Sequence, residues 1–120
     1  MSNFHNIKRE ATHYSEQIKQ LKDSLQEVTI AGKITSIVPP LCQGESDVSN
    51  NYLLKLDDEV GEITVYVSQL MKSHYDFIEI GNNVVFHGFV HVLQRRVSGK
   101  IKRDHSVYAF EAKEFDKALH

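Results

Sequence analysis

The sequence has one cysteine, two prolines and no tryptophan among its 120 residues. A single cysteine, Cys42, excludes an internal disulfide framework and any CxxC metal motif, and its polar surroundings indicate an ordinary reduced thiol. The chain also lacks an apolar run near the ~20 residues of a membrane-spanning helix, and it lacks a charged-then-apolar signal at its N-terminus. We therefore expect an intracellular protein without a membrane segment, cytoplasmic or nucleoid-associated, or nuclear in a eukaryote.

Positive charge is also scarce. The sequence has 14 lysines and arginines and 16 acidic residues, which gives a net charge of −2. This balance argues against a surface that binds nucleic acid everywhere without specificity. The length and a hydrophobic content of 41% allow one modest core and no second one.

The residue patterns of common catalytic sites are absent. There is no glycine-rich phosphate loop, no nucleophile beside a base, and no pair of carboxylates on an apolar background. His87 and His91 lie four residues apart on a predicted strand, a separation of about 13 Å that is too long for a shared zinc ion. The sequence therefore predicts a non-catalytic binding module without cofactor or metal.

The clearest pattern that is present is an alternation of apolar residues on both sides of an acidic turn. Leu54 and Leu56 precede the turn, and alternate residues from Ile63 to Val67 follow it. The turn itself, DDEVG at residues 57–61, offers side-chain acceptors and a glycine, as hairpin turns do. This segment predicts a β-hairpin with one face in a core.

Three more strands and a helix are predicted around this hairpin. Residues 28–38 alternate before Pro39, with Gly32 where a bent strand needs no side chain. Ser68 is placed to cap a helix that runs to residues 81–83, with apolar positions at Leu70, Met71, Tyr75 and Ile78. Residues 84–93 and 107–115 are the fourth and fifth strands. The fold class is therefore all-β, a five-stranded Greek-key barrel with a helix between strands three and four.

Several of these segments carry a family resemblance. VTIAGKI from Val28, YLLKLDD from Tyr52 with GEITV from Gly61, and IGNNVVFHGFV from Ile80 resemble the tRNA-anticodon-type OB-fold nucleic-acid-binding family. Similar domains occur in class II aminoacyl-tRNA synthetases, the α subunits of bacterial polymerase III, exonuclease VII large subunits and archaeal replication protein A. The resemblance implies an OB barrel, which we place at residues 28–116. Outside it we expect an N-terminal amphipathic helix within residues 1–27 and a tail at 117–120.

The positive charge is concentrated in one segment. Residues 94–105 contain five basic residues against one acidic residue, Asp104. This segment joins the predicted strands four and five, a loop that flanks the ligand groove of OB barrels. Phosphate contacts are therefore predicted for Arg95, Arg96, Lys100, Lys102 and Arg103. An exposed hairpin kept soluble by its charge is the alternative.

The strand alternation also predicts which side chains line the groove. If the apolar residues of the hairpin point inward, then Lys55, Thr64 and Tyr66 point outward, and Lys33 does so on the first strand. Tyr66 is the predicted base-stacking residue, with Lys33 and Lys55 beside it. Packing of Tyr66 under a neighbouring loop or helix is an open alternative. On strand four, Phe89 lies on the outward side with the two histidines.

Two further regions flank the barrel. Residues 4–27 have apolar residues at spacings of three and four, which predicts an amphipathic helix that packs on the barrel or contacts a second chain: Phe4, Ile7, Ala11, Tyr14, Ile18, Leu21 and Leu25. Residues 39–51 form a long polar loop, the second loop beside the groove, which we expect to become ordered on ligand binding.

These observations predict a protein that binds single-stranded nucleic acid, with single-stranded DNA in replication, recombination or repair as the preferred ligand. The alternative is a protein-interaction subunit of a DNA- or RNA-processing complex, assembled through the N-terminal helix by self-association or with another protein. A third hypothesis is an RNA binder of the anticodon type.

Overall fold

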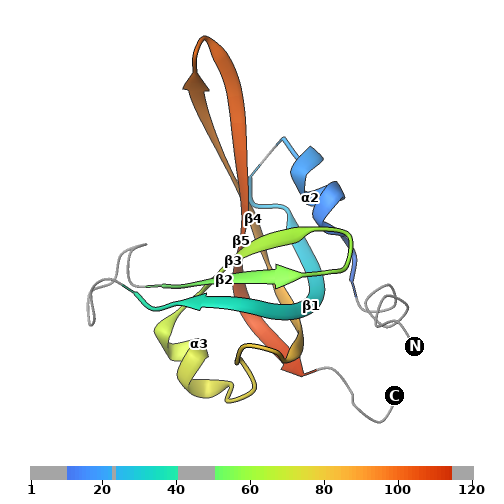
Figure 1. Ribbon diagram of the computed structural model, residues 1–120, viewed down its shortest axis with the longest axis vertical. Coiled ribbons are helices and arrows are strands. Elements are labelled where there is room, and N and C mark those ends of the chain that lie inside the picture. The colour runs from blue at the N-terminus through green and yellow to red at the C-terminus, as the bar shows by residue number, and fades with distance from the viewer. Residues whose placement is uncertain (1–10, 23, 41–50, 115–120) are drawn as a thin grey trace.

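The computed structural model describes residues 11–22, 24–40 and 51–114. The five strands close into a barrel in the order β1-β2-β3-β5-β4, with β3 and β5 parallel and the other neighbours antiparallel. This confirms the predicted OB barrel with a helix between strands three and four (Figure 1). The elements in chain order are α2 (Ser15–Gln20), β1 (Glu27–Val38), β2 (Tyr52–Asp57), β3 (Glu62–Val67), α3 (Gln69–His74), β4 (Asn83–Val97) and β5 (Lys100–Glu114).

The core is built from the alternating residues that the sequence indicated. Leu54 and Leu56 on β2 and Val65 and Val67 on β3 are fully buried, because their strands place every second side chain inside the barrel. Gly32 lies where β1 and β2 approach each other most closely. A Cβ at this position would stand 2.4 Å from the Asp57 carbonyl oxygen, so a side chain would force the two strands apart.

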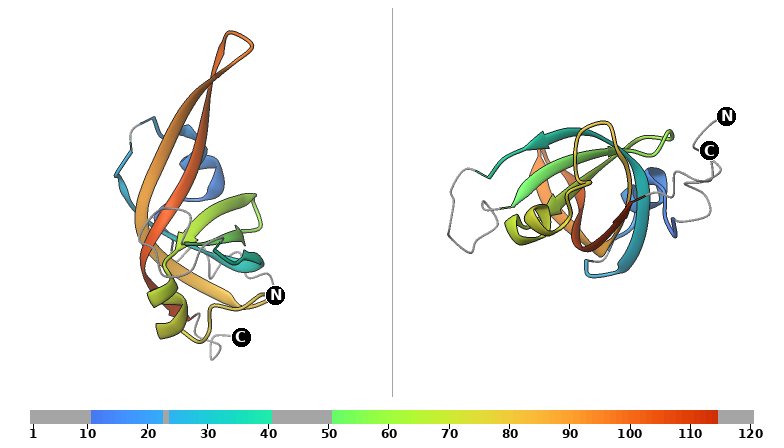
Figure 2. Two further views of the ribbon diagram at one scale, coloured as in Figure 1. Left: turned by 90° about the vertical axis from the view of Figure 1, so that its left-hand side faces the viewer. Right: turned by 90° about the horizontal axis from the view of Figure 1, so that it is seen from below.

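The basic segment is part of the sheet and not the loop that the sequence predicted. From Gly88 onwards β4 pairs with β5 in one register as far as Val97 and Lys100, and the turn between them consists of Ser98 and Gly99, with φ of 53° and 78°. Positive φ at both positions is the geometry of a tight two-residue hairpin turn. Residues 94–103, which we call the arm, project from the barrel as a twisted ribbon (Figures 1 and 2).

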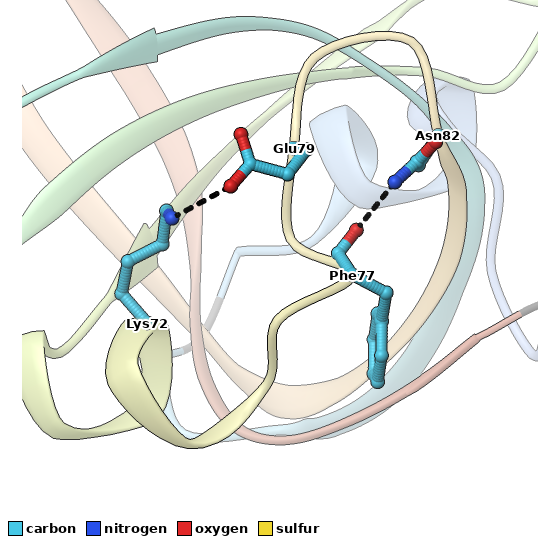
Figure 3. Close-up of polar contacts among 4 residues, drawn as sticks. All are labelled: Lys72, Phe77, Glu79 and Asn82. Carbon is cyan, nitrogen blue, oxygen red and sulfur yellow. Dashed lines mark hydrogen bonds and ion pairs between the residues drawn. The ribbon is translucent and has the colours of Figure 1, made fainter.

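The helix after β3 begins as predicted and ends earlier. The Ser68 hydroxyl accepts a hydrogen bond from the Met71 N–H at 3.1 Å, which confirms the cap. The helix stops at His74, so Leu70 is exposed and the buried Ile78 lies beyond its end. Two contacts hold the chain between α3 and β4. The Asn82 side-chain amide donates a hydrogen bond to the Phe77 carbonyl, and Lys72 forms an ion pair with Glu79 (Figure 3). The described helices are too short to span a membrane.

The expected helix over residues 4–27 is much shorter in the described part of the chain. Only α2 is helical, and Leu25 is 75% exposed with a φ of 72°. The reason is competition from the barrel: the Leu25 N–H bonds the Val90 carbonyl at 2.7 Å, and the Thr12 N–H bonds the Thr29 carbonyl at 2.8 Å. Extended backbone on both sides of α2 therefore pairs with β4 and β1. Phe4, Ile7 and Cys42 lie outside the described residues.

The helix that does form packs on its own barrel, one of the two arrangements considered for it. Ile18 is 2% exposed and belongs to the core cluster. The β2–β3 turn anchors the start of α2, because the buried Asp58 carboxylate accepts hydrogen bonds from the Ser15 N–H at 2.7 Å and the Ser15 hydroxyl at 3.1 Å. After α2, the Leu21 carbonyl lies 2.7 Å from Nε2 of His105 on β5. These contacts place α2 beside the base of the arm (Figure 2).

Candidate nucleic-acid interface

A pocket of about 450 Å³ lies where α2, the β2–β3 hairpin and the base of the arm meet. It is lined by Ser15, Ile18, Lys19, Lys55, Glu62, Ile63, Thr64, Arg103, Asp104 and His105. The volume falls in the range of small-molecule sites, roughly 300–1,000 Å³. Three separate parts of the chain therefore build one concave site.

Three cations reach this pocket from three different elements. Lys19 belongs to α2, and its Nζ lies 3.8 Å from the position that a Cβ atom on Gly61 would occupy. Lys55 comes from β2 and donates to the Thr64 hydroxyl at 2.9 Å. Arg103 comes from the arm. Neither Lys19 nor Arg103 forms an ion pair with a described residue, so both charges are available to an anion.

Two acidic residues also line the pocket, and they differ in their partners. Asp104 is engaged by Arg95, whose Nη2 donates to Oδ1 at 3.3 Å and whose Nε donates to Oδ2. Glu62 makes no ion pair or side-chain hydrogen bond with a described residue. The pocket therefore combines cations with one carboxylate that can still accept hydrogen bonds.

The arm divides its basic residues between two faces. Arg95 is the cross-strand partner of Lys102, and Val97 is the partner of Lys100, so Arg95, Lys100 and Lys102 share one face. Arg96 and Arg103 lie on the other face. The pocket at the base of the arm is lined from both faces, by Arg103 on one and by Asp104, the partner of Leu93, on the other. The side chains of arm residues adjacent in sequence thus lie on opposite sides of the ribbon.

A row of aromatic rings continues from the pocket over the outer surface of the barrel. Tyr66 on β3 and Tyr108 on β5 have their ring centroids 4.8 Å apart. The centroid of the His91 ring lies 5.5 Å from that of Tyr108. Burial, and to a lesser extent the adjacent Tyr66 phenol, raises the pKa of Tyr108. Tyr108 therefore remains a neutral hydrogen-bond donor at physiological pH, and its ring adds to the stacking surface of Tyr66.

The structure brings together part of the predicted groove. Lys55 and Arg103 share the pocket, and Tyr66 follows Thr64 on the same face of β3. Lys33 is exposed on β1 and does not line the pocket. The arm face that carries Arg95, Lys100 and Lys102 is opposite to that of Arg103, and along β5 it continues into the face that carries Asp104 and Tyr108.

Sequence reasoning missed Lys19, Glu62 and Tyr108. The outward position of Tyr108 followed from the alternation of its strand, but its contact with Tyr66 depends on the parallel register of β3 and β5. No sequence pattern points to Lys19. In the described residues, no three His, Cys, Asp or Glu side chains are placed to hold a metal ion.

Comparison with known proteins gives matches at the level of structure. No family model and no curated protein sequence matches the chain. A small single-stranded DNA-binding protein from Streptomyces coelicolor matches with a TM-score of 0.54 and 17% identity over 80% of this chain and 98% of that one. The SSB of Plasmodium falciparum, solved in complex with ssDNA, matches with a TM-score of 0.50 and 13% identity over 81% and 100%.

An OBody bound to hen egg-white lysozyme, AM3L09, matches with a TM-score of 0.56 and 20% identity over 89% of this chain and 96% of that one. At these identities the similarity shows the fold alone. The barrel of this chain is thus shared with proteins whose described ligands are single-stranded DNA in two cases and a protein in the third.

Proposed function

We propose that this chain is a non-catalytic protein that binds single-stranded nucleic acid, with single-stranded DNA as the ligand and replication, recombination or repair as the setting. One observation carries the proposal: Lys55 of the barrel and Arg103 of the arm line one pocket, and the adjacent, half-buried Tyr66 and Tyr108 rings lie beyond it on the barrel surface. Cations beside aromatic rings at the surface suit a strand whose phosphates and bases are both accessible.

Two of the structural matches support this ligand, because their descriptions name single-stranded DNA and they share the barrel. The finer resemblance to anticodon-type domains has no support from the comparisons and stays a prediction, as does the intracellular location. Because nothing in the site distinguishes ribose from deoxyribose, the binding experiment includes single-stranded RNA.

The test is fluorescence anisotropy with labelled ~20-mer single-stranded DNA, single-stranded RNA and duplex DNA at ~50 mM salt. We expect the wild type to bind single-stranded DNA, and the double variant Lys55→Ala/Arg103→Ala to bind it at least about tenfold more weakly, because two phosphate contacts are lost. The matched control, Lys22→Ala/Lys33→Ala, removes the same charge at exposed positions outside the pocket and is expected to change binding little.

Equal losses in the two double variants would show that the net charge matters and the pocket does not. Failure of the wild type to bind any single strand at tens of micromolar protein would overturn the proposed function.

A second function is favoured by two exposed phenylalanines at the end of this aromatic row, where Phe89 is the cross-strand partner of Tyr108. Phe89 and Phe110 are 40% and 45% exposed, and their rings lie 5.1 Å apart on the outer face of β4 and β5. Exposed aromatic pairs are typical of protein interfaces. Since Ile18 of α2 is buried in the barrel, we place the partner of a protein-interaction subunit on this Phe89–Phe110 surface and not on α2. We expect Phe89→Ser to abolish binding of the protein partner and to leave nucleic-acid binding unchanged.

A further inference from the structure

We infer that the pocket between α2, β3 and the arm is a subsite for one nucleotide of the bound strand, in which Lys19 contacts the phosphate and Glu62 selects a base that carries an exocyclic amino group. This inference rests on the proposed function and adds to it a base preference and a role for α2, which is not part of the five-stranded barrel.

The wall that carries Lys19 is fixed to the barrel before any ligand binds. Asp58 holds the first residue of α2 through two hydrogen bonds, and the His105 ring meets the Leu21 carbonyl just after its end. Ile18, between these two anchors, is buried in the core. Lys19 is therefore presented from an anchored helix on a different wall of the pocket from Arg103, which reduces the entropic cost of ordering it on a ligand.

The charges around the pocket match the two halves of a nucleotide. Lys19 and Arg103 have no acidic partner among the described residues, and they lie on two walls of the same pocket. A phosphate oxygen accepts hydrogen bonds from both types of side chain. A pocket of about 450 Å³ is of the size that holds one nucleotide, whereas a double helix, whose major groove alone is ~12 Å wide, does not fit inside it.

Glu62 gives the pocket its chemical preference. A carboxylate repels phosphate, but it accepts hydrogen bonds from the amino group of cytosine, adenine or guanine, and thymine has no such donor. Asp104 is already occupied by Arg95, whereas Glu62 has no partner among the described side chains. Because Glu62 lies at the start of β3 beside Lys55 and Thr64, it faces a base whose phosphate is held by the neighbouring cations.

The experiment compares Lys19→Ala with Lys22→Ala, because both lysines are exposed in the same segment and only Lys19 lines the pocket. Binding is measured by anisotropy with labelled 15-mers of dC and of dT at several salt concentrations. We expect Lys19→Ala to weaken binding to both oligomers about three- to tenfold and to reduce the slope of log K against log salt by about 0.7, the value of one phosphate contact on a single strand. Lys22→Ala is expected to bind as the wild type does.

The base preference is tested with Glu62→Ala and with Glu16→Ala, an exposed acidic residue of α2 outside the pocket. The wild type is expected to bind dC 15-mers at least about threefold more tightly than dT 15-mers, and Glu62→Ala is expected to bring this ratio close to one. Glu16→Ala should keep the wild-type ratio.

The outcomes separate this inference from the proposed function. If the wild type binds single strands but Lys19→Ala matches Lys22→Ala, and the dC/dT ratio does not depend on Glu62, the subsite is refuted while the proposed function stands. If the wild type binds neither oligomer, both are refuted.

Discussion

Asp58 is the residue on which both the β2–β3 turn and the position of α2 depend. Its carboxylate is 1% exposed and accepts hydrogen bonds from Ser15, from the Val60 N–H at 3.0 Å and from the Gly61 N–H at 2.8 Å. A buried donor that loses its acceptor costs about 1–3 kcal/mol. The neighbouring Asp57 side chain, in contrast, accepts from the Glu59 N–H at 2.8 Å in a more exposed position.

The prediction is that Asp58→Ala lowers the free energy of unfolding by about 2–4 kcal/mol, and that Asp57→Ala lowers it by less than about 1 kcal/mol. Urea denaturation followed by circular dichroism measures both values. Similar losses for the two variants would mean that Asp58 acts as an ordinary turn residue and does not anchor α2.

At the scale of the element, the arm is a part of the sheet that contributes nothing to the core. Every arm side chain except Val97 is exposed, and its ion pair to Asp104 lies on the surface, where such pairs contribute little. Leu93 and Asp104 are cross-strand partners, so a two-residue turn could join them directly.

We predict that replacing residues 94–103 by Asn-Gly leaves the free energy of unfolding within about 1 kcal/mol of the wild type, because no fully buried side chain is lost. The same variant is expected to lose at least about tenfold in affinity for single-stranded DNA, since Arg96 and Arg103 are removed. Urea denaturation and anisotropy test the two statements separately. An unfolded variant would contradict the first, and undiminished binding would contradict the assignment of the arm to the ligand.

The elements predicted best from sequence were those with one buried face. Leu54, Leu56 and Val65 alternate with polar residues, and this pattern identified β2 and β3. The arm exposes both of its faces, so it carries no such alternation and was predicted as a loop. The prediction of a helix over residues 4–27 was wrong for another reason. The Leu25 N–H bonds the Val90 carbonyl, which is far away in the sequence, and the spacing of apolar residues within one segment carries no information about such a contact.

For the whole molecule, the distribution of charge decides how a strand can approach. The arm holds five of the 14 basic residues and none of the 16 acidic ones, so the rest of the chain is acidic on balance. The site could be predicted only in part, because the meeting of Lys19 with Lys55 and Arg103 depends on the closed barrel and on the anchoring of α2. An anionic strand is attracted to this corner of the molecule and repelled by most of the remainder.

This arrangement predicts that the affinity for single-stranded DNA depends only weakly on the salt concentration, because few cations contact the strand. Three cations, Lys19, Lys55 and Arg103, line the pocket. Arg96 shares the arm face of Arg103 and is counted with them as a fourth contact. At about 0.7 per phosphate contact on a single strand, the slope of log K against log salt should be about −3. Anisotropy titrations from ~50 to ~200 mM salt measure it. A slope steeper than about −5 would require the opposite face of the arm as well, and would contradict a strand confined to the pocket side, because only Arg95, Lys100 and Lys102 could supply the additional contacts in the arm.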